Sequence, residues 1–168
     1  MMRVNRIQEK CVSIKDRWKS SRGANLVEMA VVLPLLLLLT FAIVDFSMLF
    51  YAYLSLENGV SLATRYGVTG QQMNDPDNPG NLLSREDSIK VAMRQATPGL
   101  VIDDSAFTFD HLAGGVWTAG SGGPGDISRV TVNYTWSLVT PLIRPFFTGG
   151  QINLRVSSTM KNEGFPTS

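Results

Sequence analysis

The hydrophobic pattern of the chain is dominated by one long apolar run near its N-terminus. Between Glu28 and Asp45 the sequence reads MAVVLPLLLLLTFAIV, sixteen residues without a charge. A helix from Leu26 to Val44 would be ~28 Å long, close to the ~30 Å hydrocarbon thickness of a bilayer. This length exceeds that of a secretory signal's apolar region, and no small-x-small cleavage site follows it. We therefore predict a transmembrane helix over residues 24–54.

Beyond this run the pattern becomes that of amphipathic helices. Leu56, Val60 and Ala63 recur at helical spacing, and Gly67 stands where a helix C-cap is expected, which predicts that the first helix continues to about residue 67. A second helix is expected to start after Ser84 as its N-cap and to stop at Thr97-Pro98-Gly99. Its apolar stripe is Ile89, Ala92, Met93 and Ala96.

The C-terminal half alternates between apolar and polar residues, as strands do. Ranges 106–111 and 116–119 are two short candidates, and Gly120 to Gly125 is a flexible loop. Two longer strands each place an apolar set on one face: Val130, Val132, Tyr134 and Trp136 in one strand, and Ile152, Leu154, Val156 and Met160 in the other. This pattern predicts a small antiparallel sheet with one wet face, whose dry face the two helices cover. The fold class is therefore α+β.

Two segments lack either periodicity. Residues 71–80, QQMNDPDNPG, form a loop by composition, and Asp75 and Asp77 fit a solvated turn better than a calcium site. Residues 140–147 contain two prolines, which exclude a central strand. Their four large apolar residues either fold back on the core or form an exposed patch for a partner: Leu142, Ile143, Phe146 and Phe147.

Charge is distributed unevenly along the chain. Residues 1–23 hold seven Lys or Arg against two acidic residues, a net charge of +5, although the whole chain carries only +1. Basic residues beside a membrane span stay in the cytoplasm, so residues from about 55 onward are expected in a periplasm-like space. We expect no binding of nucleic acid, because the basic cluster does not continue into the folded part.

The sequence offers little chemistry for catalysis. Cys11, in the basic segment, is the only cysteine, and His111 is the only histidine. These residues cannot form a plausible zinc site, and a Ser/His/Asp triad could be built only through His111. The glycine-rich loop at 120–125 lacks the lysine of a phosphate-binding loop. We expect no enzyme activity, no cofactor and no metal.

The junction between the basic segment and the apolar run carries the most informative residues. Arg22-Gly23-Ala24 precedes the run, and Glu28 places one carboxylate inside its first turns. A charge so close to a bilayer core is costly and rarely lacks a task. A glycine at the junction is expected to give an extended backbone that a protease can grip. Together these residues indicate a processing site joined to a membrane anchor.

This arrangement resembles the prepilins, and within them the TadE-like proteins of the tight-adherence (Tad) pilus. The resemblance is carried by Arg22, Gly23, Glu28, Pro34, Asp45 and Phe46, and it covers residues 20 to 67. It implies cleavage between Gly23 and Ala24, which makes Glu28 the fifth mature residue and Met29 the sixth. The major Tad pilin has an aromatic residue where Met29 stands, so Met29 favours a minor component.

The resemblance also implies a location and partners. The expected protein is a minor pilin (pseudopilin) of the inner membrane, single-pass, which takes part in assembly of a Tad-type type IV pilus for adhesion and biofilm formation. Its expected partners are a prepilin peptidase, other minor pilins, the major pilin, the inner-membrane assembly platform and membrane lipid. The expected architecture is pilin-like, with a leader at 1–23, the transmembrane helix at 24–54 and an extracytoplasmic α+β domain at 55–168.

Two alternatives remain open at the level of the sequence. Pro34 lies inside the predicted span, where it is either simply tolerated or provides a kink and a flexible point. The whole chain could also be an uncleaved single-pass protein, whose outer domain is a periplasmic scaffold or interaction module.

Overall fold

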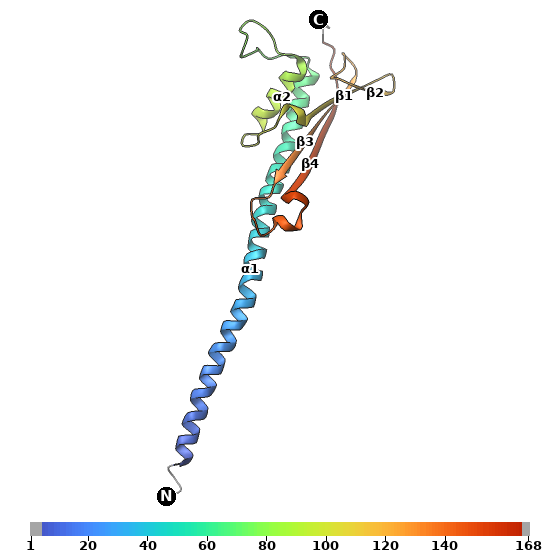
Figure 1. The fold of residues 1–168 in the computed structure, drawn as a ribbon. Helices are drawn as coiled ribbons and strands as arrows, with labels where there is room; N and C mark the ends of the chain where they lie inside the picture. Colours follow the sequence, from blue (N-terminus) through green and yellow to red (C-terminus); the bar gives the residue numbers. More distant parts are fainter. Residues whose placement is uncertain (1–4, 166–168) are drawn as a thin grey trace. The chain divides into compact units, whose positions relative to one another are not determined.

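The computed structural model describes the backbone of residues 5–165 and the side chains of residues 23–165, which group into two compact units. Unit 1 ends at Val44 and unit 2 begins at Asp45. The elements follow one another as shown in Figure 1: α1 (Asn5–Val68), α2 (Arg85–Ala96), β1 (Phe107–Ala113), β2 (Val116–Ala119), β3 (Ile127–Ser137) and β4 (Gln151–Lys161), with the short 3-10 helices η1 (Asp104–Ala106), η2 (Arg144–Phe146) and η3 (Thr148–Gly150).

The described residues of unit 1 all belong to α1, and nearly all of their described side chains are exposed. From Gly23 to Val44 all side chains are exposed except the partly buried Ala42. The hydroxyl of Thr40 donates to the carbonyl of Leu36 at 2.8 Å, which satisfies this polar group within the helix. Within the described residues, α1 is the helix that is long and apolar enough to cross a membrane. A helix of this composition with no protein cover suggests membrane anchoring.

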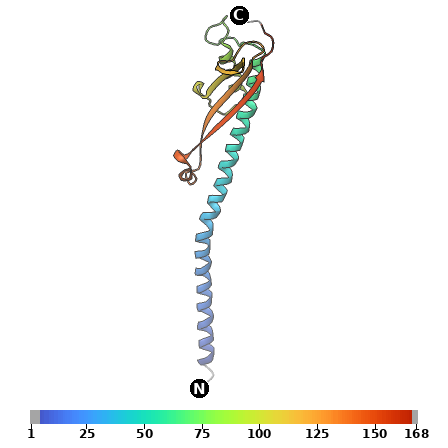
Figure 2. The same cartoon turned by 90° about the vertical axis from the view of Figure 1, so that its right-hand side faces the viewer.

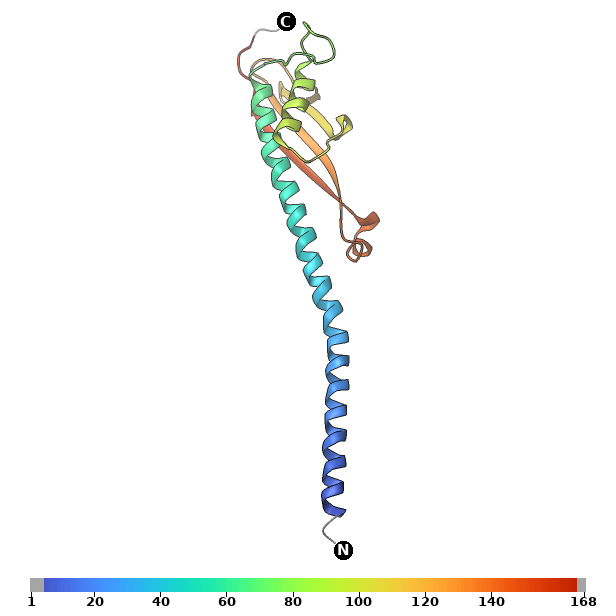
Figure 3. The same ribbon diagram turned by 90° about the vertical axis from the view of Figure 1, so that its left-hand side faces the viewer.

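Unit 2 has two layers. Four antiparallel strands form a sheet in the order β2-β1-β3-β4, and the C-terminal part of α1 lies with α2 along one face of it, as Figures 2 and 3 show from two sides. The core between the layers takes apolar side chains from both helices, three strands and the connection after α2: Leu56, Val60, Ala63, Ile89, Met93, Ile102, Phe107, Phe109, Val130, Val132 and Val156. The predicted α+β, pilin-like fold is confirmed.

The alternation of the strands fixes which face of the sheet is dry. Phe107 pairs with Val132 and Phe109 with Val130, and the two phenylalanine rings stack with centroids 6.2 Å apart beneath the helices. On the opposite face, Arg129 bonds Asp110 at 2.9 Å. The predicted dry face of this sheet is therefore confirmed by burial and by register, although Thr131 on the opposite face is also buried.

The two helices touch at glycines. An ideal Cβ on Gly59 would lie 2.9 Å from the sulfur of Met93, and one on Gly67 would lie 2.5 Å from Cδ1 of Ile89. The prediction that Gly67 caps the first helix was wrong, because Gly67 is helical and leaves room for α2 instead. The left-handed residue after α1 is Gly70, with φ 71°.

The second helix begins and ends where the sequence predicts. The Ser84 hydroxyl accepts from the backbone N–H of Asp87, and Thr97 ends the helix. Hydrogen bonds from Lys90 and then from Ser84 lower the pKa of the Asp87 carboxyl, so this carboxylate stays charged at the positive end of the helix.

Candidate processing and membrane-anchoring site

The predicted processing residues lie on one exposed stretch of α1. Gly23, Ala24, Glu28 and Met29 are all helical and exposed, and Met29 exposes 60% of its surface. The expectation of an extended backbone at Gly23 was wrong. The helix continues through this residue, since glycine costs only ~1 kcal/mol relative to alanine inside a helix and both flanks are good helix formers.

Glu28 is placed one helical turn after Ala24. Residues four apart on a helix are neighbours, so an amino group created at Ala24 would lie on the same side of α1 as the Glu28 carboxylate. None of the ion pairs among residues 23–165 involves Glu28. The carboxylate is therefore presented at the surface of an otherwise apolar helix.

Pro34 lies within α1, and the helix continues through it. The residues around it, Leu33 and Leu35, are exposed and apolar. The kink and the flexible point at Pro34 stay predictions.

Asp45, the first charge after the apolar run, has a task that the sequence analysis missed. Its side chain is 1% exposed, and its two carboxylate oxygens accept the backbone N–H groups of Val139 at 3.3 Å and Thr140 at 3.2 Å. The next residue, Phe46, meets Phe147 edge to face, with ring centroids 6.4 Å apart. Asp45 and Phe46 therefore hold the β3–β4 connection against α1. We call these contacts the clasp. The feature of the sequence that could have revealed this role is a lone carboxylate at the end of an apolar helix.

Of the four apolar residues in 140–147, two form an exposed surface and two fold back on the protein. Leu142 and Phe146 are 52% and 73% exposed, as an exposed patch requires. Ile143 is 5% exposed and Phe147 packs against Phe46, so these two fold back instead. Including Ile143 in an accessible patch was wrong, because its side chain is buried.

Arg85 is a second residue whose role the sequence analysis missed. Its guanidinium donates to the carbonyls of Gly67 at 2.8 Å and Gly122 at 2.6 Å, and to the Asn162 side chain at 2.8 Å. Burial lowers the pKa of this guanidinium. The feature of the sequence that could have revealed this role is an arginine in the first turn of a helix, where the helix dipole disfavours a positive charge.

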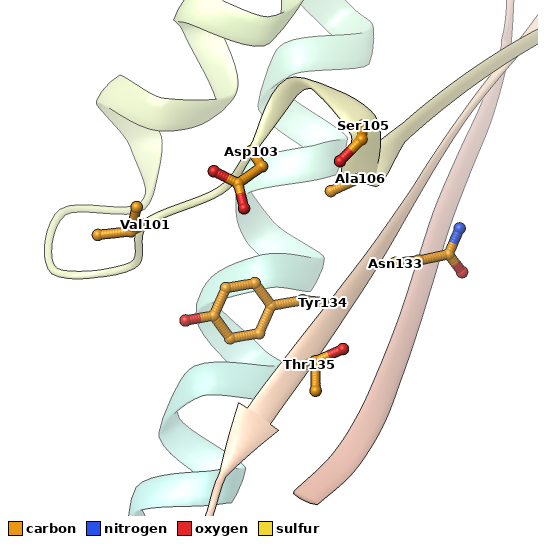
Figure 4. A pocket seen from close by; sticks show the side chains of 7 residues that line it. All are labelled: Val101, Asp103, Ser105, Ala106, Asn133, Tyr134 and Thr135. Carbon is orange, nitrogen blue, oxygen red and sulfur yellow. The ribbon is translucent and has the colours of Figure 1, made fainter.

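A shallow hollow of about 300 Å³ lies between η1 and β3 (Figure 4). Its side chains are mostly small, apolar or neutral: Val101, Asp103, Ser105, Ala106, Asn133, Tyr134 and Thr135. Figure 4 shows Asn133 pointing away from Tyr134, as neighbours on a strand do. In the part of the chain with described side chains, no three His, Cys, Asp or Glu residues are grouped to hold a metal ion.

Comparison with known proteins agrees with the N-terminal pattern. Residues 23–65 match the family model described as TadE-like protein. Neither curated proteins nor solved structures yield a match. The matched segment begins at Gly23, contains Glu28 and Asp45, and ends inside α1, so it covers the exposed apolar helix and the helical part of the core. Over residues 23–65 the chain is therefore similar to the TadE-like proteins, as the pattern of its junction predicts.

Proposed function

We propose that the chain is a minor pilin (pseudopilin) that takes part in assembly of a Tad-type type IV pilus, which serves adhesion and biofilm formation. One observation carries the proposal: Gly23, Ala24 and Glu28 lie together at the start of an exposed apolar helix that leads into a pilin-like α+β unit. Its role is structural, as a packed subunit or a component that helps others to assemble.

The first step of the proposed function is removal of the basic leader. A prepilin peptidase in the inner membrane cuts between Gly23 and Ala24, with residues 1–23 in the cytoplasm and unit 2 in the periplasm. The seven basic residues of the leader favour this orientation. Because Gly23 is helical, the peptidase has to unwind this turn, which glycine makes easier than any residue with a side chain except proline.

The second step is packing of the mature helix among its neighbours. Cleavage gives Ala24 a positive amino group, and Glu28 of an adjacent subunit can neutralise it. In a bundle of apolar helices an ion pair is stronger than in water, and an unpaired charge is heavily penalised. Glu28 thus fixes the axial position of one helix against the next. The partners in this step are the major pilin, other minor pilins and the inner-membrane assembly platform.

The test of processing is the mass of the chain extracted from membranes. We expect the mature chain to begin at Ala24, and Gly23→Val to leave it full-length, since a β-branched side chain stiffens this turn and fills the place where the peptidase contacts the backbone. Ala42→Val, in the same helix but away from the junction, is the matched control and should be cleaved normally. A full-length wild-type chain in cells with an active prepilin peptidase would refute the proposal.

An uncleaved single-pass scaffold is the second candidate. The continuity of α1 through Gly23 favours it, because nothing in the backbone marks the junction for cutting. This candidate requires the same orientation and anchor but predicts that the leader persists. The mass measurement therefore separates the two candidates directly.

A further inference from the structure

The connection between β3 and β4, residues 138–150, carries apolar side chains that the core does not use. Val139, Leu142 and Phe146 expose 56%, 52% and 73% of their surfaces. We call these three residues the loop patch. Exposed apolar side chains concentrated in one short connection indicate an interaction surface.

The connection is firmly built. The N–H of Leu138 donates to the carbonyl of Gly150 at 3.1 Å, which closes the loop at its base. The Arg144 side chain donates through Nε to the carbonyl of Leu138 at 2.8 Å, and the Ile143 side chain is buried. The Asp45 carboxylate then holds two N–H groups of the loop from α1. These hydrogen bonds fix the conformation of the connection, and in this conformation the loop patch is exposed.

The clasp also sets the level of the loop patch along α1. Asp45 directly follows Val44, the last residue of the apolar run, and the span from Leu26 to Val44 is ~28 Å long, about the hydrocarbon thickness. Because the loop is bonded to Asp45 itself, this level follows from chain connectivity. Figure 1 shows the η2–η3 segment beside α1, at the lower end of β3 and β4.

We propose that the loop patch enters the interfacial region of the bilayer that α1 spans, and that the β3–β4 connection is a second membrane contact of the protein. The inference rests on anchoring of residues 24–44 in the membrane and goes beyond the proposed pilus function. It commits to a lipid surface because the connection is bonded to Asp45, which directly follows the apolar run in the chain.

The neighbouring chemistry fits lipid. Phe50 and Tyr51 of α1 are 63% and 65% exposed one to two turns beyond Asp45, where interfacial aromatic residues belong. Arg144 is exposed within the connection and suits a lipid phosphate. No Asp or Glu occurs between Asp126 and Glu163, so no carboxylate of the connection opposes an anionic surface.

The experiment measures the depth of a fluorophore at single cysteines in the full-length chain. The chain carries Cys11→Ser and is placed in vesicles of phosphatidylcholine and phosphatidylglycerol, with or without lipids that bear a nitroxide near the head of the acyl chain. Leu142→Cys reports on the loop patch and Leu36→Cys on the span. The matched control is Leu82→Cys. The exposed fraction of Leu82, 58%, is similar to that of Leu142. Leu82 lies just before α2, and Arg85 of α2 donates to the carbonyl of Gly67. Gly67 is ~33 Å from Asp45 along α1.

We expect the nitroxide lipids to quench the fluorophore at position 142 at least about twofold more than that at position 82, since interfacial side chains enter the headgroup and acyl boundary. Phe146→Ser in the Leu142→Cys chain should reduce this quenching. Equal quenching at 142 and 82 with a quenched probe at 36 would overturn the inference and leave anchoring intact. An unquenched probe at 36 would overturn both. A probe at 142 shielded from water only at high protein concentration, without lipid quenching, would overturn the inference in favour of a protein partner.

Discussion

Asp45 illustrates at the level of one residue how a polar group at the end of an apolar helix organises the surrounding chain. A buried carboxylate is costly unless its oxygens accept hydrogen bonds. Here two consecutive backbone N–H groups, those of Val139 and Thr140, provide them. The same bonds satisfy two donors in a connection that has no strand partner. One side chain therefore determines where the β3–β4 connection meets α1.

Asp45→Asn is predicted to lower the stability of unit 2. The asparagine side chain has one acceptor oxygen, so one of the two backbone donors loses its partner, which costs ~1–3 kcal/mol. The melting temperature of the full chain in detergent micelles checks this, and Asp45→Ala should lower it further. The control Asp77→Asn changes an exposed carboxylate in the 71–80 loop and should leave the melt unchanged. An unaltered melt for Asp45→Ala would contradict the clasp.

Glu28 is predicted to be needed for assembly rather than for insertion. Glu28→Leu should insert at least as well as the wild type, because removing a charge lowers the transfer cost by up to ~2.5–3.5 kcal/mol at mid-span and by less near the interface. Glu28→Gln keeps size and polarity but cannot pair with the Ala24 amine. We expect its membrane level and cleavage to be normal and its number of pili to be reduced. Wild-type pilus numbers in that strain would rule out the pairing role.

At the scale of elements, the contact between α1 and α2 depends on two glycines. Gly59 and Gly67 lie eight residues apart on α1 and face Met93 and Ile89 of α2. Each glycine lets the partner side chain approach the backbone directly. The position of α2 over the sheet therefore depends on the absence of two methyl groups.

Gly59→Ala is predicted to destabilise unit 2, although alanine is the better helix former. The added Cβ would lie 2.9 Å from the Met93 sulfur and would also meet the Thr97 methyl group, and overpacking of this kind costs ~1–3 kcal/mol. The matched control is Gly23→Ala, a helical glycine whose added Cβ meets no atom within 4 Å, so only the favourable propensity of ~1 kcal/mol remains. A higher melting temperature for Gly59→Ala than for the wild type would contradict the close contact.

The sequence predicted those elements whose signal is local. The dry face of β3 and the cap at Ser84 depend on neighbouring residues, and both are confirmed. The role of Gly67 was misjudged because a helix-ending glycine and a helix-packing glycine look alike until the partner helix is placed. The clasp at Asp45 was missed because its bonds join residues more than ninety positions apart. The processing residues stay predictions, because their meaning depends on an enzyme outside the chain.

At the scale of the whole molecule, the end of α1 is bonded to the segment that follows β4. Asn162 is 3% exposed and its side-chain amide donates to the carbonyls of Ser121 and Gly123, while Glu163 donates its N–H to Val68, the last residue of α1. Arg85 joins the same group through Asn162. The end of α1, the loop after β2 and the end of β4 therefore form one connected region. Such closure favours cooperative unfolding of the unit as a whole.

Unit 2 is predicted to fold without its anchor. A chain of residues 55–168 retains Leu56 and Val60, which contribute the α1 side of the core, and should show mixed helix and strand circular dichroism with a cooperative melt. A chain of residues 45–168 also retains the clasp at Asp45 and should melt at a higher temperature. A disordered spectrum for both pieces would refute an independently folded unit.

The dry face of the sheet can be tested in the same truncated chain. Trp136 lies on that face, where its indole nitrogen is buried without a hydrogen-bond partner, so Trp136→Asp would place a charge on the dry face of the sheet. We expect the cooperative melt to disappear. Thr135→Asp is the matched control, because Thr135 is the adjacent residue on the wet face and exposes its hydroxyl beside Asn153. It should leave the transition cooperative. Because the two substitutions add the same charge at neighbouring positions of β3, a melt lost in both or kept in both would mean that the two faces do not differ as the register indicates.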